Sequence, residues 1–166
     1  MFLVFGCVAC GGAQGQSQSL GAFGTQVNQF VADASSHGVS VDTSNLVVQV
    51  GDLSSASTTT VVNGVTETTT NVDVGQCDFT EAGPTVTISA TAIQSFGPES
   101  LEALVYHELG HCLLKLEHNS NLSADGTPAS LMYPTGVDGQ TYLKNRAAYL
   151  DELFSQPQNT AFVGGG

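Results

Sequence analysis

The segment 97–116 has the marks of a helix that carries two histidines on one face. It opens with Gly97-Pro98-Glu99, a start signal, because proline fits the first helical position and an acidic side chain there favours the helix dipole. An apolar stripe then recurs at helical spacing through Leu101, Val105, Leu109, Cys112 and Leu116. His107 and His111 lie one turn apart, so both imidazoles can reach a single Zn²⁺ at about 2.0–2.1 Å. The segment therefore predicts a helix that is packed on one side and presents a metal site.

Glu108 lies between these two histidines in sequence and is offset from them around the helix, which completes the pattern H-E-x-x-H. Its carboxylate can reach a metal-bound water without binding the metal itself. Zinc lowers the pKa of such a water to about 7, and a nearby carboxylate can take the proton and deliver it to a leaving amine. The pattern predicts a hydrolytic site with Glu108 as the general base.

Two further features follow this helix. His118 places three histidines within 12 residues, and Met132 lies fourteen positions later in the run Ser130-Leu131-Met132-Tyr133-Pro134. In these residues the chain resembles the metzincin zinc peptidases, and the matrixins most closely, over about residues 98–134. It also resembles small bacterial lipoprotein-like metalloproteases that carry H-E-L-G-H-C. The resemblance implies His107, His111 and His118 as zinc ligands, and Met132 in a Met-turn that forms an apolar floor beneath the metal.

The spacing departs from the metzincin pattern at one point. In that pattern the third histidine follows the second by six residues, with a glycine halfway; here His118 follows His111 by seven, and Leu114 replaces the glycine. A continuous helix would place His118 roughly 10.5 Å along the axis from His111, too far to share an ion. If His118 is a ligand, the helix must end near Leu114–Lys115. The alternative is a helix that runs on and a carboxylate as the third ligand, Glu152 first and Glu117 second.

Two cysteines lie in the body of the chain, Cys77 before the strand expected at 84–91 and Cys112 on the histidine helix. In an oxidising compartment they would pair and close a loop of about 35 residues. The alternative is that Cys112 is a small buried apolar residue on the core stripe.

The N-terminus has the composition of a secretion signal. Residues 1–10 are apolar apart from Gly6 and end in Val-Ala-Cys10, and Gly-Gly follows. This ending resembles a bacterial lipoprotein cleavage box, which implies lipidation of Cys10, with Cys7 as a second candidate. We expect a leader and linker over 1–19, one catalytic domain over 20–156 and a flexible tail over 157–166. The expected location is extracytoplasmic, either secreted or lipid-anchored at a bacterial cell envelope.

Charge excludes two classes of partner. The 166 residues contain 3 basic and 15 acidic side chains, for a net charge of -12. Nucleic-acid binding and attachment to anionic lipid through a basic patch both need Lys and Arg clusters, which are absent from the sequence. No apolar run reaches the roughly 18 residues that a membrane span needs. The expected partner is a protein or peptide substrate, bound by a monomer.

The remaining patterns indicate an α+β fold. Helical spacing predicts helices at 20–36 and 138–154, and 45–50 reads as a strand. Asn63-Gly64 between β-branched runs predicts a hairpin over 57–74. The alternating segment 84–91 is expected to be a half-buried strand near the cleft, where substrate backbone can pair with its edge. The whole is expected to be a zincin-like (metzincin) fold, with a small mixed sheet packed on an N-terminal helix and the H-E-x-x-H helix, then the Met-turn and a C-terminal helix.

Three minor features have competing interpretations. Asn119, Asn121 and Asp125 offer oxygen ligands for Ca²⁺, but their spacing matches no defined loop and a solvated surface loop is the alternative. Tyr133 is either a donor to an oxyanion or a packing residue. His37 is expected to cap a helix end through the helix dipole.

These patterns lead to one expected function and one rival. The expected function is a zinc-dependent endopeptidase that hydrolyses peptide bonds with a metal-activated water and Glu108 as the base. The rival is a catalytically inactive, surface-anchored binding domain that keeps zinc as a structural ion. Intact Glu108 favours the enzyme, because a structural site has no use for a base at that position.

Overall fold

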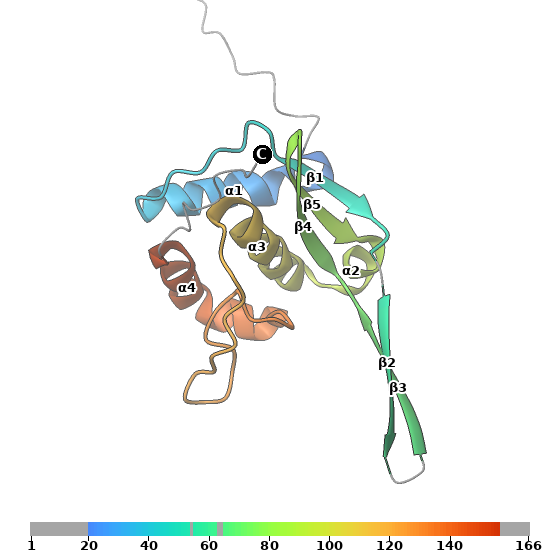
Figure 1. The fold of residues 1–166 in the computed structure, drawn as a ribbon. Helices are drawn as coiled ribbons and strands as arrows, with labels where there is room; N and C mark the ends of the chain where they lie inside the picture. The colour runs from blue at the N-terminus through green and yellow to red at the C-terminus, as the bar shows by residue number, and fades with distance from the viewer. Residues whose placement is uncertain (1–19, 54, 63–64, 157–166) are drawn as a thin grey trace, which may run out of the picture.

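The computed structural model describes residues 20–53, 55–62 and 65–156, and within them the chain is a mixed α+β structure (Figure 1). A short 3₁₀ turn at Gly21–Phe23 precedes the main elements, which are α1 (Gly24–Ser36), β1 (Val47–Gly51), β2 (Ser55–Val62), β3 (Val65–Val72), β4 (Gly75–Thr80), β5 (Gly83–Ser89), α2 (Ala90–Ser95), α3 (Pro98–Leu114) and α4 (Gly139–Ser155). The expected α+β class is thus confirmed. The leader with Cys7 and Cys10, the Asn63-Gly64 turn and the tail 157–166 lie outside the described residues.

A three-stranded mixed sheet has the order β1-β5-β4 within the described part of the chain. β1 runs parallel to β5 and β4 antiparallel to it, with Val48 and Cys77 on either side of Val86. The expectation that the strand at 84–91 borders the cleft is wrong, because β5 is the central strand. Its Val86 and Ile88 are fully buried. β4 forms the edge instead.

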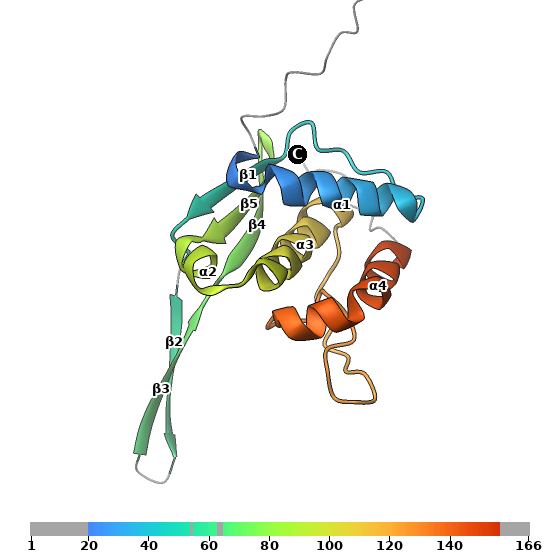
Figure 2. The ribbon, with the colours of Figure 1, turned by 180° about the vertical axis from the view of Figure 1, so that it is seen from behind.

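The β2–β3 hairpin confirms the prediction made from the Asn63-Gly64 signal. The two strands pair antiparallel, from Ser55 opposite Val72 to Val62 opposite Val65. The hairpin projects from one end of the three-stranded sheet, away from the helices (Figure 2). Residues 73 and 74 connect it directly to the edge strand β4.

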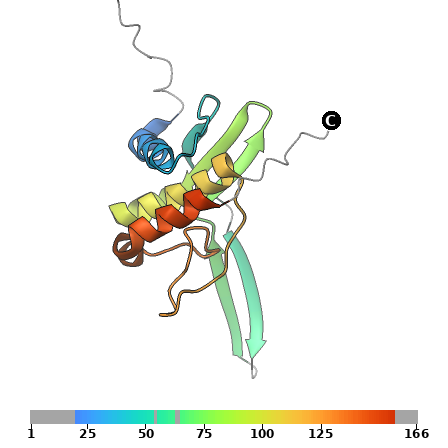
Figure 3. The ribbon, with the colours of Figure 1, turned by 90° about the vertical axis from the view of Figure 1, so that its left-hand side faces the viewer.

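α3 is the central helix of the molecule. It packs on β4 and β5 and contacts both α1 and α4, which runs alongside it (Figure 3). The predicted apolar stripe is inside, with Val105 and Leu109 at 0% exposure, and the ring of Tyr106 meets Phe30 of α1 edge-on at 5.1 Å. Among the described residues no helix has the length and apolar character needed to cross a membrane.

A partly buried ionic network joins α4 to the other two long helices. Arg146 lies 2.8 Å from Asp33 of α1 and 2.9 Å from Glu102 of α3. The hydroxyl of Tyr106 also donates to Asp33, at 2.7 Å. Burial alone would raise the pKa of Asp33, but the hydrogen bonds from Tyr106 and Arg146 hold this pKa below its ordinary value of 3.8.

Replacing Arg146 with Met should lower the free energy of unfolding at pH 7 by about 1–3 kcal/mol, because two partly buried carboxylates lose their cation. Asp33 has a lowered pKa in the folded state, so its contribution is present above its unfolded pKa and is lost as the pH falls through its folded pKa. The effect of Arg146→Met should therefore shrink at pH 3. Chemical denaturation at both pH values measures it.

Lys144→Met is the matched control, since Lys144 is an exposed cation of the same helix and the described residues offer it no ion pair. It should change stability by less than about 0.5 kcal/mol. Equal losses in the two variants would show that the network contributes nothing beyond general charge.

Candidate metal centre

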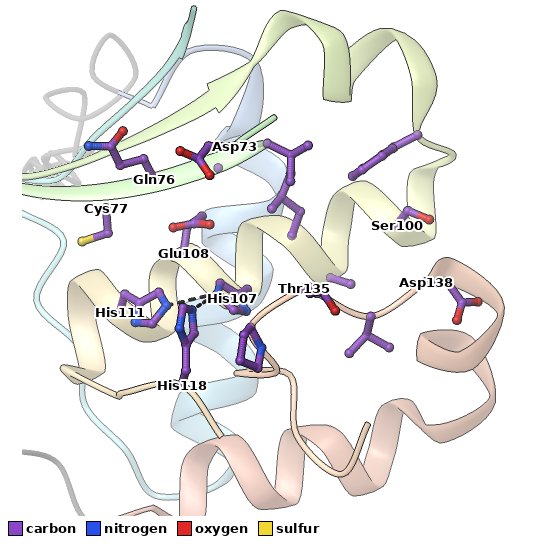
Figure 4. A pocket seen from close by; sticks show the side chains of 18 residues that line it. Asp73, Gln76, Cys77, Ser100, His107, Glu108, His111, His118, Thr135 and Asp138 are labelled. Atoms are coloured by element: carbon purple, nitrogen blue, oxygen red, sulfur yellow. Dashed lines mark hydrogen bonds between the residues drawn. The ribbon is translucent and has the colours of Figure 1, made fainter. Parts of the chain in front are cut away.

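Three imidazoles converge at one end of α3 (Figure 4). The Nε2 atom of His107 lies 3.1 Å from that of His111 and 3.3 Å from that of His118. One ring nitrogen from each residue lies within 4.8 Å of the others. Nitrogens at about 2.0–2.1 Å from a tetrahedral ion are about 3.3–3.4 Å apart, so this spacing suits a shared metal ion. These three residues can hold a metal ion, and they are the three histidines that the sequence predicts as metal ligands.

Backbone carbonyls orient two of these rings. The Nδ1 atom of His107 donates to the carbonyl of Leu131 at 2.7 Å, and that of His111 donates to the carbonyl of Leu116 at 2.6 Å. With the proton on Nδ1, a neutral imidazole keeps its lone pair on Nε2. Burial lowers the pKa of His107 to about 4 and also lowers that of His111, which favours the neutral rings. Lone pairs that face each other in this way form a donor set for a cation.

The turn after α3 explains how His118 reaches the other two rings. The helix ends at Leu114, and Lys115 adopts the left-handed conformation at φ 59° and ψ 34°. Such a backbone costs a non-glycine residue about 1–2 kcal/mol. Contacts of the Lys115 ammonium offset part of this cost: it lies 3.3 Å from the centre of the Phe79 ring and donates to the carbonyl of Cys112 at 2.9 Å. A lysine thus makes the turn, one residue after Leu114, which stands where the metzincin pattern has glycine.

The turn that contains Met132 packs against α3. Met132 is fully buried, and a Cβ atom on Gly110 would lie 2.6 Å from its sulfur. Gly110, between the two helical histidines, therefore leaves the space that Met132 fills. The same turn supplies the Leu131 carbonyl that holds His107.

Glu152 anchors this turn and does not join the imidazoles. Its carboxylate accepts hydrogen bonds from Ser130 at 2.8 Å and from Asn119 at 3.2 Å. Glu117, the other acidic alternative, is exposed and lies outside the cluster found among the described residues. Of the three candidates for a third ligand, the structure brings only His118 to the helical pair.

Glu108 is a buried acid beside the triad. It is 5% exposed, and no described residue makes a hydrogen bond to its carboxylate. The pKa of Glu108 is raised to about 7, mainly by burial and to a smaller extent by the nearby negative charge of Asp73. Its Cγ and Cδ lie 2.8 Å from where a Cβ on Gly75 would be, so the first residue of β4 must be glycine for the side chain to fit there.

A cavity of about 890 Å³ opens in front of these groups. Its lining includes the three imidazoles, Glu108, residues 73–77 of the sheet edge, one side of the first half of α3 and the segment 134–138. Figure 4 shows Glu108 between the imidazoles and Asp73, with Asp138 at the far end. The charged side chains of this lining other than the histidines are all acidic.

Four further predictions from the sequence can be compared with the structure. The disulfide between Cys77 and Cys112 is present and joins β4 to α3, which confirms that prediction. His37 caps α1, where its ring donates to the carbonyl of Asp33. Tyr133 is half-buried against the core and is not part of the cavity lining, which favours packing. Asp125 and Asn119 make hydrogen bonds within their own loop, so the calcium prediction gains no support from these contacts.

Sequence reasoning missed the residues that act on the site through their backbone. Leu131 and Leu116 contribute only carbonyl oxygens, and Gly75 contributes only its lack of a side chain, so no residue pattern marks them. Ser130 had a weak signal, as a hydroxyl inside an otherwise apolar turn. The assembled site offers three imidazole nitrogens and the buried carboxylate of Glu108 to a single cavity. Comparison with protein-family models, curated proteins and solved structures found no match to this chain.

Proposed function

We propose that this chain is a zinc-dependent endopeptidase with a zincin-like, metzincin-type catalytic domain. One observation carries the proposal: the Glu108 carboxylate, which has no hydrogen-bond partner among the described residues, faces the same cavity as the three imidazoles. Structural zinc sites are closed by four protein ligands, whereas catalytic sites have three and keep a position open. Three imidazoles beside an open cavity match the catalytic type.

His107, His111 and His118 would hold the ion through their Nε2 atoms, and the Leu131 and Leu116 carbonyls fix the orientation of the first two rings. A bound zinc ion supplies Lewis acidity, which lowers the pKa of a water to about 7 and polarises a substrate carbonyl. Glu108 takes a proton from the attacking water on its carboxylate and passes it to the nitrogen of the leaving amine. Imidazole donors also suit other transition metals, and zinc is proposed because hydrolysis needs no redox change.

The edge strand supports a polypeptide substrate. β4 pairs with β5 on one side, and no described strand pairs with its other side. Residues 73–77 line the cavity, so an extended peptide can add to this edge and place a backbone carbonyl beside the imidazoles. The disulfide favours an extracytoplasmic location, since such bonds persist in oxidising compartments. Lipid attachment at Cys10 and a monomeric state stay predictions.

Metal removal tests this function. The purified chain should contain about one zinc ion, and it should cleave internal bonds in a library of unstructured peptides. A chelator should stop cleavage, and one equivalent of zinc should restore it, because the residues provide one site. Elemental analysis and mass spectrometry of the products give both readouts. A zinc-loaded chain that cleaves no peptide would favour the non-catalytic binding domain instead.

A further inference from the structure

Three residues of β4 meet α3 and the turn that follows it at successive positions along the helix. Alternate strand residues point to one face, and Gly75, Cys77 and Phe79 all face the helix. Gly75 lies against the side chain of Glu108, Cys77 is bonded to Cys112, and the Phe79 ring lies under the ammonium of Lys115. The disulfide is the middle pair and the only covalent one. One end of this series is the proposed general base, and the other is the turn that leads to His118.

β4 has few other means to keep this register. Its sequence GQCDFT alternates, but the face toward α3 carries only two apolar side chains, none of its side chains is fully buried, and only β5 pairs with it in the described part of the chain. A strand that slips by one residue exchanges its two faces. In β4 such a slip would bring Val74 or Gln76 to the place of Gly75, where a Cβ atom overlaps Glu108. His107 and His111 lie on α3 and need no contact from this strand. Phe79 contacts the turn that leads to His118, but backbone hydrogen bonds outside β4 also hold that turn, from the N–H of Leu116 to the Gly110 carbonyl at 3.2 Å and from the N–H of Asn119 to the Met132 carbonyl at 2.9 Å.

We infer that the Cys77–Cys112 disulfide is a positioning element of the active site, which holds β4 in register so that Gly75 receives Glu108 and the strand edge borders the cavity. The inference rests on the proposed function. It predicts that metal binding and peptide cleavage respond differently to loss of the disulfide. Metal binding should survive loss of the disulfide, whereas peptide cleavage should not.

The test is the double variant Cys77→Ala/Cys112→Ala, studied in the full chain. Its kcat/KM for peptide cleavage should fall by about 10–100-fold, because a displacement of about 1 Å in a catalytic group has an effect of that size. Zinc content should stay near one per chain. Amide hydrogen exchange of residues 75–80 should accelerate, while exchange of α3 around residues 105–111 should stay slow.

Gly75→Ala distinguishes positioning from a merely structural role. In the disulfide-bonded chain it should lower kcat, with zinc retained, because the new methyl group displaces the Glu108 side chain. In the double-cysteine variant the same change should have a much smaller effect, since the strand there can already move away. Equal effects of Gly75→Ala in both backgrounds would overturn the inference.

Val27→Ala is the matched control for general destabilisation. Val27 is a buried residue of α1 and is not part of the cavity lining. It should lower the melting temperature but leave kcat/KM within about 2-fold at a temperature well below unfolding. The inference is wrong if the cysteine variant keeps its kcat/KM, or if its activity falls only in proportion to lost zinc or lost folded protein. A parent chain that loads zinc and cleaves nothing would instead refute the proposed function.

Discussion

Glu108→Gln should lower kcat/KM for peptide cleavage by about 10²–10⁴-fold, the usual contribution of a general base. Glutamine has nearly the same shape, so it can occupy the space that Gly75 leaves for the native side chain. It cannot accept a proton from water at neutral pH, so the substitution removes the base together with its negative charge and keeps the shape of the side chain. No described residue hydrogen-bonds to the carboxylate, so the substitution breaks no such contact in the fold.

The zinc content of Glu108→Gln should remain about one per chain, because Glu108 is not one of the clustered ligands. Steady-state kinetics and elemental analysis of the same preparation separate the two effects. Glu99→Gln is the matched control: it removes a carboxylate from the first turn of the same helix, outside the cavity lining, and should change kcat/KM by less than about 2-fold. If Glu108→Gln retains activity within 10-fold of the parent, Glu108 is not the base.

The long amphipathic elements of this fold could be predicted from the sequence, and the short polar ones could not. α3 begins at Pro98 as its start signal indicated, and the hairpin follows from Asn63-Gly64. β4 was missed because its short run GQCDFT contains no β-branched apolar residue and its position depends on β5 and α3. α2 was also missed, although Ser89 caps it by accepting a hydrogen bond from the backbone N–H of Ala92 at 3.0 Å.

The candidate site, too, could be predicted from the sequence only in part. The ligand side chains are visible in the sequence because their chemistry and spacing are unusual. What brings His118 to them is a backbone conformation, the left-handed Lys115, at a residue type that disfavours it. That turn depends on tertiary contacts, including the Phe79 ring of β4, which no local pattern can reveal. The one-residue insertion alone is therefore compatible with Glu152 or Glu117 as the third ligand, and the turn at Lys115 distinguishes them from His118.

His118→Ala should weaken zinc binding by well over 100-fold, because loss of a direct ligand must exceed the 10–100-fold effect of losing an outer hydrogen-bond partner. His107 and His111 should keep their positions, since each ring is held by its own backbone carbonyl. The variant should therefore fold and bind zinc only weakly through the remaining pair. Competition with a chromophoric chelator measures the dissociation constant directly, independent of any activity.

His37→Ala is the control, because it removes the histidine that caps α1 and contacts Asp151 at 3.0 Å, away from the cluster. Its zinc affinity should match that of the parent. Glu152→Gln tests the acidic alternative in the same assay: glutamine can still accept from Ser130, so affinity should change little if Glu152 only anchors the turn that contains Met132. If zinc affinity survives His118→Ala but falls in Glu152→Gln, the third ligand is the carboxylate and the turn at Lys115 does not serve the metal.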